Sequence, residues 1–476
     1  MYEVAALYLA VVAMLIVGNW RRGLTLVVLT TIIQDPLRKL APDQPVAFSL
    51  MAGVVAIMTF VVSLRSPRTR YMRPDSSREY RELKAAAMLF VGIIALQSIN
   101  GFMWHGSLAA VALGIVTYLG ALPAILVGRH LAGISGEKAM MGFLKAYLIL
   151  CVPAVATLYL QYAGVGWPIL GDVGQGIQIY DVILNGAPVS TSSGLFRSSE
   201  IAAWHIGACC CFAIMLATHR NVSMRSLATT TALVAVLLAL GLLTGRRKLL
   251  IQLAMFLFAY LFLIFFIGRM GSRLWIAVSV SVAAIWLGAR SLQELAPSDV
   301  VYRQFVARGE TGFSSVGDRF AKLGIDPLSW AYDRFGPFGG GVGAATSGAQ
   351  NYGVDAMMVA VGEGGLGKLA GELGWPGLAA AFWLSVLLAR YVLKITRRTA
   401  RLSPAAGRLR CGMAAFLIAN ISSFSVATQV FNDLFVLTTL GLFVGVLVSQ
   451  TPESAGVDKE ARAPQAQSPD SICVQA

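Results

Sequence analysis

Long apolar runs alternate with short polar segments along the whole chain. Each run holds roughly 17 to 22 residues, the length that an α-helix needs to cross a hydrocarbon core about 30 Å thick. Read in order, the runs predict thirteen membrane spans, at 4–20, 23–40, 46–64, 85–104, 107–127, 139–160, 201–218, 227–243, 249–268, 274–290, 371–393, 412–430 and 433–449. The second is the weakest, because "QDPLRK" at 34–39 interrupts it with charges and a proline. We therefore expect an all-α polytopic membrane protein with about 12–14 transmembrane helices.

The polar segments predict which helix ends share a side. The most basic loops, 65–84 and 394–410, are expected on the cytoplasmic side, where Lys and Arg are retained. Alternation places further basic loops there, at 21–22, 129–138, 219–225 and 269–273. The outer side then receives the remaining polar segments, at 161–200, 244–248 and 291–370.

These sides divide the chain into six parts. They are N-terminal transmembrane helices at 1–160, a first extracytoplasmic loop at 161–200, central transmembrane helices at 201–290, a large extracytoplasmic loop at 291–370, C-terminal transmembrane helices at 371–450 and a cytoplasmic tail at 451–476. The tail is rich in Ala, Ser, Pro and charge, so we expect it to be disordered. The large loop is too long for a simple connector and is expected to form a cap of short helices over an outer cavity.

Composition agrees with this class and argues against several others. Of the 476 residues, 57% are hydrophobic and 13% are charged. The net charge of +14 does not indicate nucleic-acid binding, because the cations lie mainly in short loops between spans. The six cysteines lie in apolar runs or in the tail, so neither disulfides nor a thiolate metal site is predicted, and no cofactor is expected. We expect Cys209, Cys210 and Cys211 to be small apolar packing residues.

One outer loop breaks the charge pattern. The stretch "LLTGRRKLLIQL" at 242–253 places Arg246, Arg247 and Lys248 between two apolar runs, on the side that otherwise avoids cations. They either extend to lipid head groups and fix the start of the next helix, or hold a diphosphate attached to a membrane lipid. We favour the diphosphate, because Arg offers it planar, bidentate geometry. Since Arg246 and Arg247 lie about 100° apart on a helix, we expect only one of them to point at the ligand.

A further basic residue precedes the predicted helix at 201–218. In "STSSGLFRSSEIAAWH", Ser198 or Ser199 is suited to cap that helix, and Glu200 lies in its first turn. Arg197 stands just outside, where it would form an anion site with the positive end of the helix. The alternative is a surface salt bridge between Arg197 and Glu200.

The large outer loop contains carboxylates beside cations but no His or Cys, which argues against zinc. Its glycine run at 339–343 lacks the features of a nucleotide loop, so it indicates close backbone approach or flexibility. Glu363, set among glycines at the expected membrane edge, is a candidate proton acceptor, with structural hydrogen bonding as the alternative. Glu372 begins the next span, where it either stabilises the helix N-terminus or binds substrate.

Together these features resemble the bacterial O-antigen ligase and polymerase superfamily. The likeness covers about residues 150–395 and is carried by the large late loop and by "GLFRSSEIAAWH", "LTGRRKLL" and "EGGLGKLAGELGWPG", with "QDPLRKL" as a weaker addition. Such proteins are similar to the metal-independent membrane glycosyltransferases, whose leaving group is polyprenyl diphosphate. The resemblance implies that Arg246 or Arg247, together with Arg197, grips the diphosphate.

One departure selects between the branches of that superfamily. Its ligases carry a His, then Asn, Ser or Gln, then nine residues and Gly-x-x-Gly. With Gly374 and Gly377 as those glycines, Glu363 and Gly364 stand at the places of the His and its neighbour. The missing His favours the polymerase branch.

We therefore expect an enzyme that polymerises polyprenyl-diphosphate-linked oligosaccharide repeat units into an exopolysaccharide, capsule or O-antigen chain, at the outer face of the bacterial inner membrane. Arg246 and Arg247 would stabilise the leaving diphosphate, and Glu363 would accept the proton of the attacking hydroxyl. The expected substrate-binding residues are Arg197, Lys248, Gln350, Asn351, Tyr352, Glu372 and Trp375. Expected partners are the lipid-linked oligosaccharide, membrane lipids, and a flippase and a chain-length regulator of the same pathway. A ligase that moves glycan to a final acceptor and a transporter of the lipid-linked oligosaccharide are the alternatives.

Overall fold

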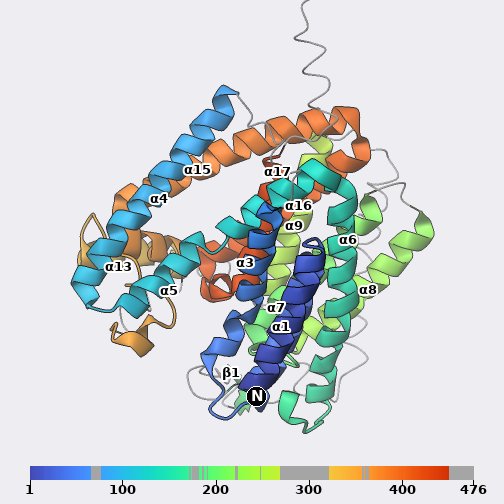
Figure 1. The fold of residues 1–476 in the computed structure, drawn as a ribbon, viewed down its shortest axis with the longest axis horizontal. Coiled ribbons are helices and arrows are strands. Elements are labelled where there is room, and N and C mark those ends of the chain that lie inside the picture. The colour runs from blue at the N-terminus through green and yellow to red at the C-terminus, as the bar shows by residue number, and fades with distance from the viewer. Residues whose placement is uncertain are drawn as a thin grey trace, which may run out of the picture.

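The computed structural model describes residues 1–65, 77–170, 173, 182–184, 187–189, 191–219, 223–246, 248–267, 321–355, 359 and 364–449. The chain is helical within these residues, apart from turns and one short hairpin (Figure 1). That hairpin pairs β1 (Val182–Leu184) with β2 (Ala187–Val189) in antiparallel register. The predicted helical fold is confirmed.

The first part of the chain forms six α-helices and two short 3-10 helices: α1 (Tyr2–Gly18), α2 (Arg22–Leu40), η1 (Val46–Leu50), α3 (Met51–Leu64), α4 (Arg78–His105), α5 (Leu108–Leu119), α6 (Leu122–Tyr162) and η3 (Pro168–Leu170). After the hairpin come α7 (Ser199–Thr218), α8 (Met224–Leu242) and α9 (Lys248–Ile267). The last part contains a π-helical turn η4 (Ala321–Ile325), α13 (Asp326–Phe335), η5 (Ala349–Tyr352), α15 (Gly365–Leu402), α16 (Pro404–Val426), η6 (Gln429–Asn432) and α17 (Leu434–Leu447).

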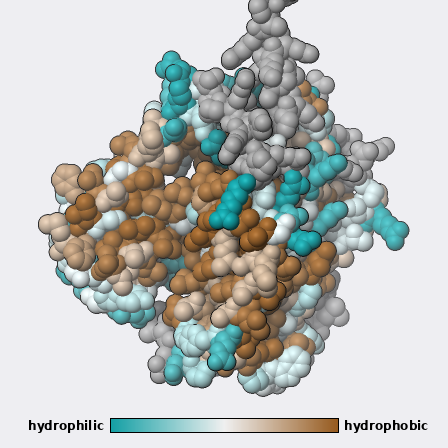
Figure 2. Space-filling model, in the orientation of Figure 1, coloured by the Kyte–Doolittle hydropathy of each residue, from teal (hydrophilic) through white to brown (hydrophobic). Residues whose placement is uncertain are grey.

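Eight helices in the described part of the chain are long and apolar enough to cross a membrane, and α1 and α17 are shorter apolar helices. The eight are Val46–Leu64, Arg78–His105, Leu108–Gly133, Gly136–Tyr162, Ser199–Thr218, Met224–Leu242, Lys248–Ile267 and Gly365–Leu402. Figure 2 shows a broad belt of hydrophobic side chains across one face, with hydrophilic side chains gathered toward its ends. A polytopic membrane protein is thus confirmed, and the predicted span at 274–290 lies outside the described residues.

Helix α2 is continuous where the sequence indicated an interruption. It runs through "QDPLRK" with Pro36 inside it, and Gln34, Asp35, Arg38 and Lys39 are all buried. These polar side chains face the interior of the protein rather than lipid. Each of them has a hydrogen-bond partner there. The segment predicted as a weak second span is therefore a continuous helix, and its charged side chains bond to groups inside the protein.

Helix α7 lies at the centre of the bundle. Some 89% of its apolar window is buried, against α6, α8, α9 and α16. Cys209, Cys210 and Cys211 are all fully buried in it, which confirms their predicted packing role. At the periphery, α15 lies along α4 and crosses the top of the bundle obliquely (Figure 1).

The basic loops that were expected to share a side do meet at one end of the bundle. The Nε2 atom of His219 lies 2.7 Å from Oε1 of Glu137, and the Arg408 guanidinium donates to the His219 carbonyl. Lys394 forms an ion pair with Glu79 at the same end. We call this the basic end, and we call the opposite end, which carries 191–198, 243–246 and 248, the polar-loop end.

Candidate functional site

A tight turn between α8 and α9 presents the cations of the Arg-rich step. Gly245 has a φ of +64°, a conformation that favours glycine, and its amide bonds the carbonyl of Leu242 at 2.9 Å. The Thr244 hydroxyl accepts from the backbone N–H of Arg246 at 3.3 Å. Arg246 ends this turn and Lys248 begins α9, whereas Arg247 lies outside the described residues.

Arg246 and Lys248 converge on one carboxylate. Nη1 of Arg246 and Nζ of Lys248 each lie 3.2 Å from Oε1 of Glu200, in the first turn of α7. Nε of Arg246 donates to the Ser199 hydroxyl at 2.9 Å. The amide nitrogen of Gln429 donates to the same carboxylate in the orientation that satisfies both groups, 2.7 Å from Oε1. We call Ser199, Glu200, Arg246, Lys248 and Gln429 the cation cluster.

The segment before α7 holds this cluster in place. Ser198 caps the helix by accepting from the N–H of Ile201, as predicted. The N–H of Ser192 donates to the carbonyl of Leu243 at 3.0 Å, which ties the segment to the Arg-rich turn. The start of α7 and the start of α9 are thereby fixed against each other.

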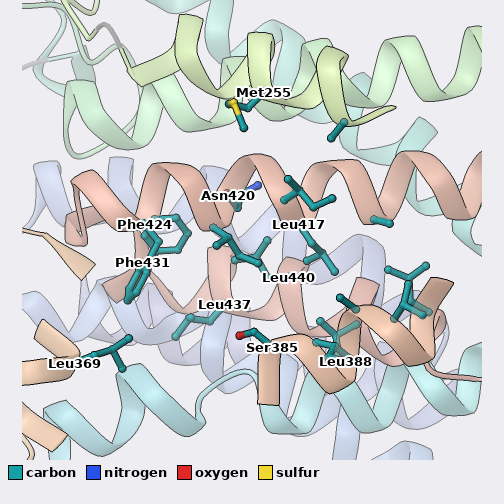
Figure 3. Close-up of a pocket in the computed structure, with 18 of the residues that line it drawn as sticks. Met255, Leu369, Ser385, Leu388, Leu417, Asn420, Phe424, Phe431, Leu437 and Leu440 are labelled. Carbon is teal, nitrogen blue, oxygen red and sulfur yellow. The ribbon is translucent and has the colours of Figure 1, made fainter. Parts of the chain in front are cut away.

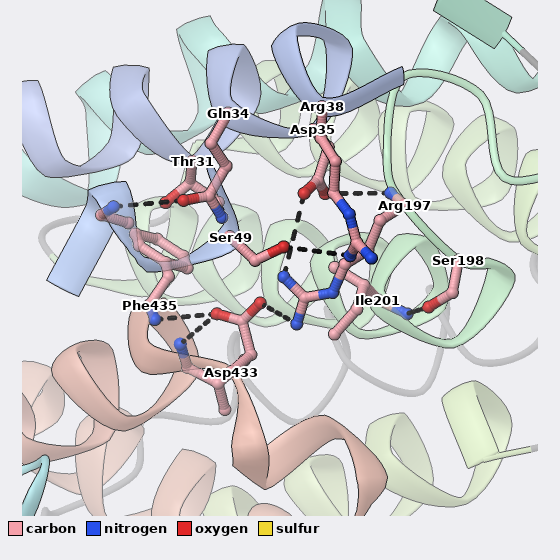
Figure 4. A network of polar contacts seen from close by, with 12 residues as sticks. Thr31, Gln34, Asp35, Arg38, Ser49, Arg197, Ser198, Ile201, Asp433 and Phe435 are labelled. Atoms are coloured by element: carbon pink, nitrogen blue, oxygen red, sulfur yellow. Dashed lines mark hydrogen bonds and ion pairs between the residues drawn. The ribbon is translucent and has the colours of Figure 1, made fainter. Parts of the chain in front are cut away.

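Arg197 does not pair with Glu200. Its Nη2 lies 2.6 Å from Oδ2 of Asp433, its Nη1 lies 3.8 Å from Oδ1 of Asp35, and its backbone N–H donates to Oδ2 of Asp35 at 2.9 Å (Figure 4). Burial lowers the pKa of this guanidinium, but Asp433 and Asp35 outweigh burial and raise it above the usual value. The proposed surface salt bridge with Glu200 is therefore wrong, because Glu200 is held by Arg246 and Lys248 while two buried carboxylates take Arg197.

Neighbouring residues of α2 complete this network. Arg38 donates from Nε to the carbonyl of Gln44 at 2.9 Å and from Nη1 to the Ser49 hydroxyl at 3.2 Å (Figure 4). The Lys39 ammonium donates to the carbonyl of Gly194 at 2.6 Å. The charges of "QDPLRK" thus secure the segment that leads into the cation cluster.

A small pocket lies beside the cation cluster. It is bounded by Glu200, Arg246 and Lys248 on one side and by Trp204 and Phe431 among the apolar residues on the other. The indole N–H of Trp204 donates to Oδ1 of Asn420 at 2.8 Å. Both Phe431 and Asn420 also line a much larger cavity.

That larger cavity has a volume of about 670 Å³ and is lined mainly by apolar side chains of α4, α9, α15, α16 and α17 (Figure 3). It reaches from Phe424 and Phe431, next to the cation cluster, to Leu393 and Leu447, toward the basic end. An apolar cavity beside a charged rim fits an amphiphile with an anionic head and a hydrocarbon tail.

The predicted close backbone approach of the glycine run is confirmed, and Glu372 binds the loop that follows this run. A Cβ on Gly341, whose φ is +86°, would lie 2.1 Å from the backbone nitrogen of Gly101. Glu372 is fully buried, and its Oε1 accepts from the Ala345 N–H at 3.0 Å and the Thr346 hydroxyl at 2.7 Å. Its carboxylate therefore anchors the loop after the glycine run to the second turn of α15.

The other predicted sugar-binding residues lie on the surface. Gln350, Asn351 and Tyr352 are exposed residues of η5, which contacts α5, and the side chain of Trp375 is also exposed. Among the described residues, no hydrogen bond or ion pair joins them to the cation cluster. Glu363, the predicted base, lies outside the described residues.

The sequence interpretation missed Asp35, Asp433 and Gln429 as contributors to this end of the bundle, and it considered Ser199 only as a helix cap. Asp433 carried a usable signal, since a lone carboxylate directly before the last apolar run is placed to cap a helix. Its side chain does accept from the N–H groups of Phe435 and Val436, at 2.8 and 3.3 Å.

No protein-family model matches the chain, and no curated protein matches it. The resemblance to the O-antigen ligase and polymerase superfamily accordingly rests on the quoted motifs alone. The cation cluster and the adjoining cavity are therefore the features that bear on function.

Proposed function

We propose that the chain is a membrane glycosyltransferase that polymerises polyprenyl-diphosphate-linked oligosaccharide repeat units at the polar-loop end of the bundle. The observation that carries this proposal is the apposition of the cation cluster and the apolar cavity, which share Phe431 as a common wall. Polyprenyl diphosphate combines the two matching parts, an anionic head and a long hydrocarbon tail.

The cation cluster suits a diphosphate better than a permanent internal pair. Arg246 and Lys248 together carry two positive charges and share the single carboxylate of Glu200, so the three side chains keep a net positive charge. Both cations are only partly buried, which leaves their outer faces available to an anion. The role of Glu200 is to hold the two cations at a fixed separation before substrate arrives.

In the proposed reaction, the bond between the anomeric carbon of one sugar and the diphosphate oxygen breaks. A hydroxyl oxygen of the acceptor sugar bonds to that carbon from the opposite face, and its proton passes to a base. Charge then develops on the leaving diphosphate, where Arg246 and Lys248 stabilise it. Direct displacement of this kind inverts the anomeric centre.

We propose Glu363 as the base. The position of Gly365, two residues later, supports this choice. A Cβ on Gly365 would lie 2.4 Å from the ring of Phe424, so the backbone at the start of α15 packs directly against that ring. The rings of Phe424 and Phe431 are 5.3 Å apart, and Phe431 borders the cation cluster. The chain just after Glu363 therefore reaches the wall that the cavity and the cluster share.

A test uses the purified chain in proteoliposomes without an ion gradient, supplied with lipid-linked repeat units, and resolves the products by size. Arg246→Ala should slow chain growth about 100-fold or more, the usual effect of removing one charge-stabilising group. The matched control is Arg225→Ala, which removes an exposed cation at the other end of α8 and should leave the rate within about twofold. Wild-type chain growth in Arg246→Ala would refute the proposal.

A transporter is the second candidate, and one observation favours it. The cavity extends from Phe431 beside the cation cluster to Leu393 near the basic end, as a path for a lipid between the two faces would. Movement of lipid-linked units across the bilayer with no new glycosidic bond would establish that function instead. A single transfer to a final acceptor, without chain growth, would identify a ligase.

A further inference from the structure

A second cavity lies at the opposite end of the molecule from the cation cluster. Its volume is about 420 Å³, and in the described part of the chain it is lined by six residues of α15, five of them cationic: Arg390, Leu393, Lys394, Arg397, Arg398 and Arg401. The spacing of 390, 394, 397 and 401 puts these side chains on one face of the helix. They extend over roughly 17 Å at 1.5 Å per residue. We call Arg390, Lys394, Arg397, Arg398 and Arg401 the basic stripe.

Little negative charge in the described part of the chain balances this stripe. Lys394 forms an ion pair with Glu79. Arg390, Arg397 and Arg401 are exposed and form no hydrogen bond or ion pair through their side chains among the described residues. Like charges three and four residues apart on a helix repel each other, so the arrangement favours an anion from outside.

The stripe continues directly into apolar surface. Leu393 lines both this cavity and the larger apolar cavity, and Ala389 and Val392 line the latter on the same stretch of α15. A bound molecule with a phosphate at the stripe would therefore place its adjoining part against hydrocarbon. A soluble phosphate or an acidic protein segment gains nothing from that continuation.

We infer that the basic stripe and the end of the apolar cavity at Leu393 form a binding site for an anionic phospholipid of the adjoining leaflet. The headgroup phosphate lies among Arg390, Lys394, Arg397 and Arg401, and one acyl chain passes Leu393 into the cavity. Helix α15 crosses the top of the bundle obliquely (Figure 1), so the stripe near its C-terminal end would run along the headgroups rather than straight into the hydrocarbon.

Charges that serve only to orient a chain in the membrane need neither a shared face nor a cavity, since the orientation bias depends on their number and side. The stripe has both. It would bind lipid whether or not sugar is transferred at the polar-loop end, because the two sites share only the apolar cavity between them.

The test measures lipid binding to the full chain in detergent micelles by native mass spectrometry, titrating phosphatidylglycerol against phosphatidylcholine. The variant R390Q/R397Q/R401Q removes three cations of the stripe. Its matched control, R21Q/R22Q/R225Q, removes three exposed cations outside the stripe. Leu393→Trp narrows the junction with the apolar cavity and leaves the charges in place.

Wild type and R21Q/R22Q/R225Q should bind phosphatidylglycerol about tenfold more tightly than phosphatidylcholine, and R390Q/R397Q/R401Q should lose that preference. Leu393→Trp should weaken phosphatidylglycerol binding but not that of inorganic phosphate. If both triple variants lost the preference for phosphatidylglycerol equally, the proposal would be overturned. Binding would then depend on the number of cations and not on their position in the basic stripe. Full displacement of the lipid by millimolar inorganic phosphate, with no effect of Leu393→Trp, would reassign the stripe to a soluble anion.

Discussion

The ion pair between Arg197 and Asp433 can be broken without disturbing the helix cap that Asp433 also provides. Asn caps helices as well as Asp does, so Asp433→Asn keeps the hydrogen bonds to Phe435 and Val436 and removes the charge. Arg197 is then left with Asp35, whose Oδ1 lies 3.8 Å from Nη1 rather than at the 2.6 Å of the lost contact.

The expected cost follows from burial. The Asp433 side chain is 2% exposed and that of Arg197 is 14% exposed, so solvent replaces little of the lost interaction. Removing one partner of a buried pair costs about 3–5 kcal/mol. Because Asp35 remains as a partner of Arg197, we expect Asp433→Asn to cost about 3 kcal/mol. Asp433→Ala should cost about 1 kcal/mol more, because it also removes the cap.

The assay is unfolding of the purified chain by SDS from mixed micelles, followed by helical circular dichroism, with the free energy of unfolding as the readout. Arg78→Gln is the control, since it breaks an exposed pair in which Arg78 and Glu82 are 85% and 43% exposed. That variant should change the free energy by less than about 1 kcal/mol. A loss of less than about 1 kcal/mol in Asp433→Asn would refute the reasoning, because the buried pair would then be worth no more than the exposed one.

Three further outcomes are expected. Gly341→Ala should lower the free energy of unfolding by more than about 2 kcal/mol in the same titration, because its Cβ would meet the Gly101 backbone, whereas Gly142→Ala, with open space beside it, should cost nothing. Leu440→Trp, inside the apolar cavity, should raise the KM for lipid-linked substrate about tenfold, or about 1.4 kcal/mol, and an unchanged KM would place the lipid tail elsewhere. In a Cys473→Ala variant, N-ethylmaleimide should label no cysteine until the protein unfolds, because the other five are buried, and fast labelling of Cys209, Cys210 or Cys211 would contradict the central position of α7.

The helices and their common ends were predictable from the sequence because apolar length and loop charge are local properties. The meeting of Arg246, Lys248 and Glu200 was not, since Glu200 lies more than forty residues before them and contact across helices has no local signal. The partners of Arg197 are still more distant in sequence, at Asp35 and Asp433.

The interpretation of α2 failed for a related reason. Charges in an apolar run were taken as a break, although Asp35, Arg38 and Lys39 recur at the spacing of one helix face. That spacing indicates a helix with a polar side turned to other helices.

The contact of Asp35 with Arg197 and, through it, with Asp433 also constrains how the chain is assembled during synthesis. Asp35 leaves the ribosome about 400 residues before Asp433, which at 5–20 residues per second is a delay of about 20–80 s. Once Arg197 has been made, its guanidinium has Asp35 at 3.8 Å but still lacks the 2.6 Å contact with Asp433, and burying an incompletely paired charge is costly. A nascent chain that stops before Asp433 would leave this charge incompletely paired, so the residue that begins the last helix completes a network joining three distant parts of the chain.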